Sequence, residues 1–350
     1  MNKNIFFILP VLFIIFSSPS FSSPDVKATS SHPTTTTIIS PSNSTVAVGK
    51  SITFHAKVAD YVPPESTPYG TVTWSDGGKG GKFNSTSCTL VFYSSNESIC
   101  SVAYTPSSAG LVTITAAYGG GGFHASSSAS TPLTVTLRTS TSTITPNPAT
   151  VTAGKAITFS TKVNDPGTGT KTPPTGIVTW SDGGKGGKFN STSCTLTIYS
   201  TSASTCSISY TPSIAGSVTI NGTYGGKDGV HAGSFGLTSL TVTLRTSTTT
   251  ISGPVNATIG TLTTFYAKVN DPGTGTKTPP TGIVTWSDGG KGGIFSASSC
   301  ILAPFKGSSS ESICSVTYTR STAGSITITG TYGGDSSHSG SFGTLGFKVY

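Results

Sequence analysis

The sequence predicts an all-β protein built of three consecutive β-sandwiches, and three observations lead to this prediction. Trp74, Trp180 and Trp286 follow one another at an interval of 106 residues. The segment KVNDPGTGTKTPPTGIVTWSDGGKGG occurs identically at 162–187 and 268–293, so the chain contains duplicated units. Within each unit, apolar residues alternate with polar or small ones, which is the period of a half-buried strand, and no stretch has the period of a helix.

The strands of the first unit follow one another in a clear order. After an opening strand around Thr35–Ile39, each further strand is marked by a set of alternating apolar residues: Ile52, Phe54, Ala56 and Val58; Val72 and Trp74; Cys88 and Leu90; Cys100, Val102 and Tyr104; Val112, Ile114, Ala116 and Tyr118; and Leu133, Val135 and Leu137. Clusters of Gly, Pro, Ser and Asn separate these sets. About seven short strands per unit fit a sandwich of immunoglobulin type, in which two half-apolar sheets bury their faces against each other.

The N-terminus indicates export. Lys3 precedes the apolar run Ile5–Phe16, which is too short to span a bilayer comfortably and is followed by small polar residues. This arrangement predicts a secretory signal peptide at residues 1–22 with cleavage near Ser22, and an uncleaved anchor is the alternative. No later segment is apolar enough to cross a membrane, so we expect an extracellular chain with no membrane span after processing.

The boundaries between units are short. We expect immunoglobulin-like units at 33–138, 139–245 and 246–350, because the segments Leu133–Pro146 and Leu240–Pro254 carry the last strand of one unit almost directly into the next. Flexible linkers are longer and richer in glycine or charge. We therefore predict a rod of limited bending, on the order of 100 Å or more in length, from strands that rise about 3.3 Å per residue.

Composition limits the classes of partner. Charged residues make up 9% of the chain, and the formal charge of +8 comes from scattered lysines. Nucleic-acid binding requires a clustered basic face with interleaved aromatic residues, so we do not expect it. A mild attraction to anionic surfaces is compatible with the charge.

Six cysteines, two in each unit of an exported chain, predict three disulfides. Pairing within units is the simplest connectivity, although the spacing leaves exchanges between units open. We expect each bond to join neighbouring strands in the middle of its unit and to have a structural role, because C-x-x-C and zinc-ligand spacings are absent. The expected pairs are Cys88–Cys100, Cys194–Cys206 and Cys300–Cys314.

The glycine-lysine stretch WSDGGKGG invites comparison with a phosphate-binding loop. A P-loop needs G-x-x-x-x-G-K-[ST] between a strand and a helix, whereas Phe83 follows Lys82 and no helix follows. We interpret the stretch as a turn in which Asp76 and its counterparts Asp182 and Asp288 cap the backbone. The carboxylates are too sparse for acid–base catalysis, and we expect no catalytic residue, cofactor or metal.

Three sets of repeated polar residues have alternative interpretations. A calcium site would use Asp60, Asp165 and Asp271, but no run of oxygen ligands supports it. His124, His231 and His338 are expected to pack on their own units, with a repeated contact to an acidic partner as the alternative. An intramolecular isopeptide bond would use Lys57, Lys162 and Lys268, whose strand positions point outwards rather than into the core.

The motif N-x-[ST] is the acceptor for N-linked glycosylation, and it occurs at six places in the chain. In a chain so rich in Ser, Thr and Asn, several of these matches arise by chance. The candidate residues are Asn43, Asn84, Asn96, Asn190, Asn221 and Asn256.

The end of each unit resembles a known family. The sequence ITITGTYGGDSSHSGS of the third unit, with GTVTW or GIVTW upstream in each unit, is similar to the prokaryotic Ig-like domain called group 3. The resemblance covers about residues 33–350, and the first two units depart from it at Gly121 and at residues 227–228, near the place of Asp335. It implies tandem modules of exported bacterial and archaeal surface proteins that act as spacers, adhesive units or stalks, with no catalytic residue to carry over.

These observations predict a non-enzymatic secreted or cell-surface rod that serves adhesion or surface architecture and meets surface proteins or glycans as partners. A glycan-binding module is the alternative, for which Phe92, Tyr93 and Phe123 are candidate contacts, although Phe92 has the parity of a core residue. A third alternative is one part of a larger assembly such as a surface layer.

Overall fold

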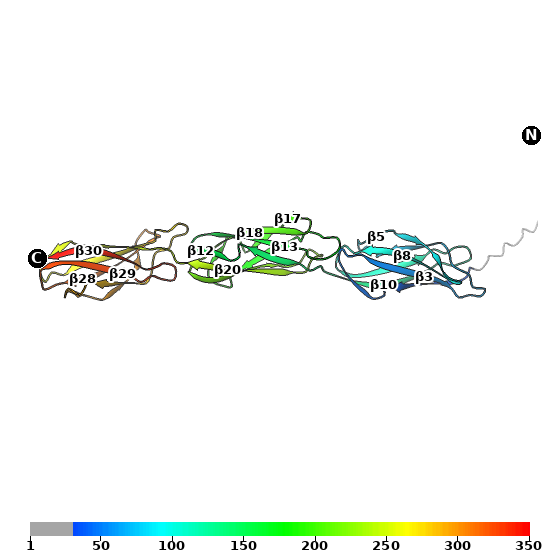
Figure 1. Cartoon of the computed structure of the whole chain (residues 1–350), viewed down its shortest axis with the longest axis horizontal. Coiled ribbons are helices and arrows are strands. Elements are labelled where there is room, and N and C mark those ends of the chain that lie inside the picture. The colour runs from blue at the N-terminus through cyan, green and yellow to red at the C-terminus, as the bar shows by residue number, and fades with distance from the viewer. Residues whose placement is uncertain (1–30) are drawn as a thin grey trace, which may run out of the picture.

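A computed structural model describes residues 31–350, and throughout this part of the chain all regular secondary structure is β-strand. Figure 1 shows three sandwiches placed end to end in one rod, with the first unit at one end and the C-terminus at the other. The predicted fold class is confirmed for the described residues. The expected signal peptide at 1–22 lies outside them.

Each unit contains ten strands. Unit 1 has β1 (Thr34–Ser40), β2 (Ser44–Ala47), β3 (Ile52–Asp60), β4 (Thr71–Ser75), β5 (Lys82–Phe83), β6 (Ser87–Thr89), β7 (Val91–Ser94), β8 (Glu97–Thr105), β9 (Gly110–Tyr118) and β10 (Ser127–Thr136). Unit 2 has β11 (Thr141–Thr145), β12 (Ala149–Thr152), β13 (Ile157–Asn164), β14 (Ile177–Ser181), β15 (Lys188–Phe189), β16 (Ser193–Thr195), β17 (Thr197–Ser200), β18 (Ala203–Thr211), β19 (Gly216–Tyr224) and β20 (Ser234–Thr243). Unit 3 has β21 (Thr248–Ser252), β22 (Asn256–Ala257), β23 (Thr263–Asn270), β24 (Ile283–Ser287), β25 (Ile294–Phe295), β26 (Ser299–Ile301), β27 (Ala303–Pro304), β28 (Glu311–Thr319), β29 (Gly324–Tyr332) and β30 (Ser341–Val349).

The strands of a unit form two sheets with the same order in all three units. In unit 1 one sheet has the order β1-β3-β8-β5, with β7 also paired to β8, and the other has the order β2-β10-β9-β4-β6. The pair β2–β10 is parallel, and the other pairs in the unit are antiparallel. Two facing sheets with crossing connections are the architecture of an immunoglobulin-like sandwich.

Each unit has its own core between its sheets. Most of the inward-facing residues predicted from the alternation are buried, among them Phe54, Trp74 and Tyr104 in unit 1. Leu137 is an exception, since it follows the end of β10 and is 40% exposed. The turn after the tryptophan strand is fixed by Asp76, whose carboxylate accepts hydrogen bonds from the backbone N–H groups of Gly78 (3.0 Å) and Gly81 (2.9 Å). The same carboxylate accepts a 3.0 Å bond from the hydroxyl of Tyr104, so the turn is also attached to the core.

The disulfides differ from the expectation in one respect. They join Cys88 to Cys100, and in the same way Cys194 to Cys206 and Cys300 to Cys314, which are the expected within-unit pairs. However, β6 and β8 belong to different sheets, so the bond of unit 1 pins the two sheets together instead of joining hydrogen-bonded neighbours. The expectation of neighbouring strands was wrong because parity identifies which face a residue occupies and not which sheet contains its strand.

A second expectation also fails. Phe92 was assigned the parity of the core, but its side chain is 72% exposed. It lies on β7, a short edge strand with a register irregularity between Phe92 and Ser94. The chain passes from one sheet to the other between β6 and β7, so the parity of Cys88 and Leu90 does not carry over to Phe92.

Candidate functional site: the junctions between the units

The strongest concentration of buried charge lies where one unit meets the next. Residues 137–140 connect β10 to β11, and residues 244–247 connect β20 to β21. Each connection contains one arginine that is almost fully buried, Arg138 at 3% exposure and Arg245 at 2%. Arginine is almost never buried without a partner, so each junction must satisfy a guanidinium group.

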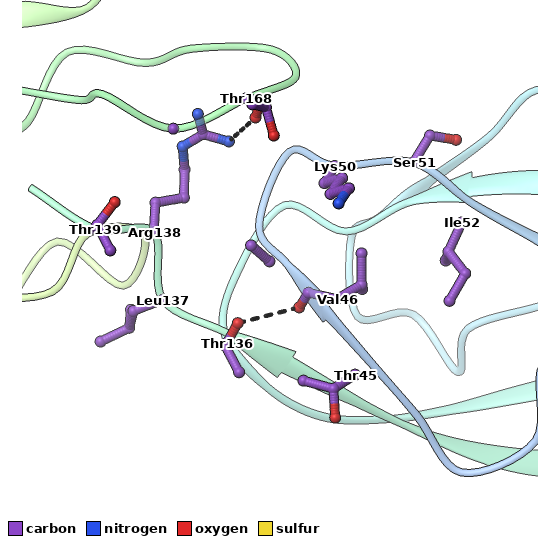
Figure 2. Close-up of a pocket in the computed structure, with 12 residues that line it drawn as sticks. Thr45, Val46, Lys50, Ser51, Ile52, Thr136, Leu137, Arg138, Thr139 and Thr168 are labelled. Atoms are coloured by element: carbon purple, nitrogen blue, oxygen red, sulfur yellow. Dashed lines mark hydrogen bonds between the residues drawn. The ribbon is translucent and has the colours of Figure 1, made fainter.

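Arg138 bonds to both units that it connects. Its Nε and Nη2 donate to the two carboxylate oxygens of Asp165 in unit 2, at 2.8 and 3.0 Å. Its Nη1 donates to the carbonyl of Val48 in unit 1 at 2.8 Å and to that of Thr168 in unit 2 at 3.1 Å. The bond to Thr168 is visible in Figure 2. This two-pronged pairing of guanidinium and carboxylate is directional, so it fixes orientation as well as contact.

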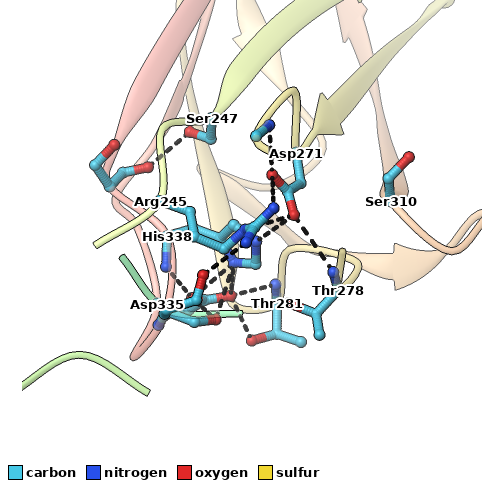
Figure 3. A network of polar contacts seen from close by, with 12 residues as sticks. Arg245, Ser247, Asp271, Thr278, Thr281, Ser310, Asp335 and His338 are labelled. Carbon is cyan, nitrogen blue, oxygen red and sulfur yellow. Dashed lines mark hydrogen bonds and ion pairs between the residues drawn. The ribbon is translucent and has the colours of Figure 1, made fainter. Parts of the chain in front are cut away.

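Arg245 repeats this geometry at the second junction, as Figure 3 shows. Its Nε and Nη2 donate to Asp271 of unit 3 at 2.7 and 3.0 Å, and its Nη1 donates to the carbonyl of Ala153 in unit 2 at 2.6 Å. The two junctions therefore use the same three donor groups in the same roles.

The aspartates remain ionised despite their burial. Burial raises the pKa of Asp165, but the Arg138 guanidinium and the backbone N–H groups of Thr172 and Gly167 more than offset it and hold that pKa below its usual range. The balance at Asp271 is the same, with Arg245, Gly273 and Thr278 lowering its pKa against burial. Each junction thus contains a fully formed ion pair.

A buried histidine lies close to the aspartate of each arginine–aspartate pair. In unit 2, His231 has its Nδ1 2.7 Å from Asp228 and its Nε2 3.5 Å from Asp165. Burial raises the pKa of Asp228, while the backbone and ring N–H groups of His231 lower it more strongly, to about 2. In unit 3, His338 and Asp335 form the corresponding pair at 3.0 Å (Figure 3). These contacts hold the loop before the last strand against the junction aspartate.

Backbone contacts complete the first junction. The N–H of Ala109 in unit 1 donates to the carbonyl of Gly229 in unit 2 at 3.1 Å, and the N–H of Thr170 donates to the carbonyl of Gly49 at 3.3 Å. Val230 of unit 2 packs against the core of unit 1. The second junction has the equivalent bonds Ala215 to Ser336 at 2.9 Å and Thr276 to Gly154 at 2.8 Å. Both junctions are therefore tied at several separate points.

An open groove runs along one side of the first junction, shown in Figure 2. Thr45, Lys50 and Thr136 of unit 1 line it together with Arg138 and Thr168. Arg138 is turned to its carbonyl and carboxylate partners, and the remaining lining is threonine, serine, glycine, aliphatic residues and one lysine. The groove thus offers no pair of titratable groups placed for acid–base chemistry.

The end of unit 1 that lies away from unit 2 resembles the ends by which units 2 and 3 contact the unit before them. His32 occupies the place of Arg138, since its backbone N–H donates to Phe123 just as that of Arg138 donates to Val230. Its Nδ1 lies 3.2 Å from Asp60, and the Nε2 of His124 lies 3.4 Å from the same carboxylate. Burial raises the pKa of Asp60. Hydrogen bonds from the backbone N–H of Val62, the ring of His32, and the backbone N–H and hydroxyl of Ser66 more than offset this effect and lower the pKa to about 2.

The residues predicted as alternatives for calcium and for histidine contacts therefore belong to these faces. The positive partner of Asp165 and of Asp271 is an arginine, and that of Asp60 is a histidine. No group of three or more metal-ligating side chains with suitable geometry occurs within residues 31–350. His124, His231 and His338 are buried and contact carboxylates of their own units, as expected for packing residues.

The other candidate residues lie away from the junctions. Lys57 and Lys268 form surface ion pairs with Glu97 (2.9 Å) and Glu311 (2.8 Å). The Nζ of Lys162 lies 4.6 Å from the ring centre of Tyr199. Of the sequon residues, four are exposed and two are half-buried; the exposed ones are Asn43, Asn84, Asn190 and Asn256, and the half-buried ones are Asn96 and Asn221. Glycan occupancy stays a prediction.

Arg138 and Arg245 were missed by the sequence reasoning. The signal that could have found them is an arginine directly after the repeated strand sequence LTVTL, once at each connection. A charged residue recurring next to an apolar strand marks a contact, but its partner lies in a loop of the following unit.

Comparisons with known proteins give only a distant likeness. No family model matches the chain, and no curated protein matches it. Among solved structures, the Escherichia coli adhesin FdeC is similar at 12% identity and TM-score 0.28, over 92% of this chain and 98% of that one. A tetra-tandem repeat from the extending region of a large adhesion protein is similar at 12% identity and TM-score 0.43, over 91% of this chain and 74% of that one. The Yersinia pseudotuberculosis adhesin InvE is similar at 10% identity and TM-score 0.33, over 59% and 58%.

These scores are below 0.5, so the fold class follows from the strand order within each unit, and the likeness carries no functional conclusion. The resemblance to the group 3 family stays a prediction. Within the described part of the chain no helix is long and apolar enough to cross a membrane.

Proposed function

We propose that this chain is a non-enzymatic extracellular rod that holds its ends at a fixed separation and direction, as a spacer or adhesive stalk at a cell surface. The single observation that carries the proposal is the buried arginine–aspartate pair at each junction, with side chains at most 2% exposed. A chain selected for free movement between units has no use for a desolvated, directional ion pair at each connection.

The other carboxylates support a structural role. Asp76, Asp182 and Asp288 each accept bonds from a turn and from a core tyrosine. The carboxylates of Glu97 and Glu311 pair with surface lysines. These groups are fixed by contacts within the fold, which favours a scaffold over a catalyst.

The disulfides support an extracellular location. Three cross-links between sheets persist in oxidising surroundings and are rare in the cytosol. Each disulfide closes a loop of the chain, and this cross-link adds stability to a unit whose core is small.

Electron microscopy of single molecules tests the proposal. We expect wild-type particles to be straight, and Arg245→Met particles to bend at the second junction because that change removes the link to Ala153 and leaves Asp271 unpaired. Lys155→Met is the matched control, since Lys155 is exposed and follows Gly154 at the same junction. Equal angular spread in all three samples would contradict the rigid-spacer proposal.

A second candidate function, glycan binding, is favoured by one specific observation. Tyr93, Tyr199 and Phe305 occupy equivalent places in the three units and are 60%, 66% and 40% exposed. The ring centres of Tyr199 and Phe305 lie 4.6 and 5.2 Å from the Nζ of the outward lysines of their units. Aromatic rings with polar surroundings are common in recognition surfaces. A glycan array with wild type and Tyr199→Ala tests this function, which requires a hit that the substitution weakens.

A further inference from the structure

We propose that copies of this chain associate head to tail, with the outer face of unit 1 of one copy docking on the outer face of unit 3 of the next. The first face, here the N-face, consists of residues 61–69 and 121–124 together with His32. The second, here the C-face, consists of residues 259–262, Arg320 and Ala323. Each is the counterpart of a surface that is already buried at the two internal junctions.

The N-face retains the docking elements that units 2 and 3 use. At the first junction the carbonyl of Gly229 accepts a bond from unit 1, and the neighbouring Val230 packs on its core. The backbone contacts of His32 and Arg138 make Gly122 and Phe123 the counterparts of this pair. Phe123 is 65% exposed, so unit 1 presents a larger apolar side chain at the position through which unit 2 docks.

The C-face retains the receiving elements. The backbone N–H of Ile259 bonds to Tyr350, directly after the last strand of its unit, and those of Val48 and Ala153 bond to the last residues of β10 and β20, which makes the three positions equivalent. Val48 and Ala153 are 4% and 0% exposed because a following unit covers them, whereas Ile259 is 50% exposed. Ala323 likewise stands where Ala109 donates its N–H to the next unit, and it is exposed.

Charge decides which surface fits the N-face. Ser66 and Thr172 make the same backbone bond to Asp60 and Asp165, so the preceding residues, Glu65 and Lys171, are equivalent. Unit 3 has Lys277 at this position. Unit 1 therefore carries an acid where both internal docking faces carry a base. Glu65 is exposed and is the only carboxylate among residues 31–350 with no hydrogen bond or ion pair to another described residue.

The complementary change occurs on the C-face. The N–H groups of Gly49, Gly154 and Gly260 donate to the carbonyls of Pro106, Pro212 and Arg320, so these three residues are equivalent. Pro106 lies beside Thr170 and Thr172, the neighbours of Lys171, around one pocket at the first junction. In the same geometry Arg320 of one copy lies next to the segment of the following copy that contains Glu65, and its guanidinium also donates to the carbonyls of Lys291 and Gly324 in its own unit. Opposite charges at this place favour the contact, whereas two bases would oppose it.

The contact is weaker than an internal junction. Pro64 stands where Thr170 donates its N–H, and proline has no N–H to donate. His32 replaces the arginine clamp. We therefore expect reversible, salt-sensitive association that grows open-ended, because a head-to-tail contact between the ends of a rod does not close on itself.

Sedimentation of the purified full chain across a concentration series tests the proposal, with electron microscopy of the same samples. We expect end-to-end species whose share rises with concentration and falls with salt. Glu65→Arg or Arg320→Glu should each weaken association roughly tenfold or more, because like charges then meet. An equimolar mixture of the two variants should restore association, since each supplies the partner that the other needs. Lys162→Glu, which alters an exposed residue outside both faces, should have no effect.

The restored association of the mixture also separates the interface effect from a folding defect. A single species at all concentrations, association that neither reversal weakens, or rods that lie side by side would overturn the proposal. A straight but monomeric rod would overturn it while leaving the spacer function intact.

Discussion

The Arg138→Met substitution probes the first junction most directly. Methionine keeps an unbranched apolar stem but removes the guanidinium group. The change leaves Asp165 without its cation and the carbonyl of Val48 without its donor at the junction. Two effects follow, one on the stability of unit 2 and one on the link between units.

The stability effect can be sized from the burial of the pair. The side chains of Arg138 and Asp165 are 2% and 0% exposed. Removing one partner of such a pair costs about 3–5 kcal/mol, because a desolvated charge is left uncompensated. Water reaches Asp165 if the junction opens, so we expect a loss at the lower end, about 3 kcal/mol, accompanied by bending between units 1 and 2.

The pH dependence follows from the pKa of Asp165. In the wild type this pKa is below the ordinary value of 3.8, so the pair stabilises the fold above that pH and its contribution is lost as pH falls through the folded pKa. Without Arg138 we expect the pKa of Asp165 to rise, because the largest interaction that lowers it is removed while the carboxyl group stays buried. The stability difference between variant and wild type is then largest near neutral pH and shrinks as acid protonates Asp165. His231 also faces Asp165, with its Nε2 3.5 Å from the carboxylate.

Hydrogen exchange read by mass spectrometry is the suitable assay, because it reports each unit separately. We expect faster exchange in unit 2, with unit 3 unchanged, and partial recovery in the double variant Arg138→Met/Asp165→Asn, which has no unpaired charge. Lys50→Met is the control, since Lys50 is exposed at the same junction. If Lys50→Met and Arg138→Met gave equal changes, or if the loss persisted undiminished at acid pH, the reasoning about the buried pair would be refuted.

Three further predictions concern unit 1. Replacing Cys88 and Cys100 by alanine should lower its free energy of unfolding by roughly 3 kcal/mol, measured by denaturant titration; an unchanged midpoint would contradict a stabilising cross-link. Reduction of the wild type should raise tryptophan fluorescence, because the Nε1 of Trp74 lies 3.1 Å from the Sγ of Cys88; unchanged emission would contradict that contact. Gly81→Ala should cost about 1–3 kcal/mol in the same titration, because a Cβ there would overlap the ring of Tyr104, and a neutral result would show that the turn can shift.

The sequence predicted the features of the fold that depend on the alternation of residues along one long strand, namely which side chains face the core between the two sheets. Val112, Ile114 and Tyr118 alternate towards the core, and the structure buries all three on β9. Short strands gave no such signal. β2 and β5 have four and two residues, too few for an alternation to stand out, so about seven strands were expected where each unit has ten.

The junction was beyond the reach of the same reasoning because its partners lie in different units. From the sequence, Asp165 is a candidate only for a calcium site that no run of oxygen ligands supports. Its actual partner, Arg138, is 27 positions earlier in the chain, and no local period connects the two. Only the end-to-end placement of units brings the carboxylate and the guanidinium together.

The distribution of arginine and histidine then has a physical explanation. The Nη1 groups of Arg138 and Arg245 need a carbonyl from a preceding unit, and the internal junctions supply Val48 and Ala153. His32 needs only Asp60 and stays 25% exposed in its side chain. The same arrangement around an aspartate thus occurs with an arginine at the two internal junctions and with a histidine in unit 1.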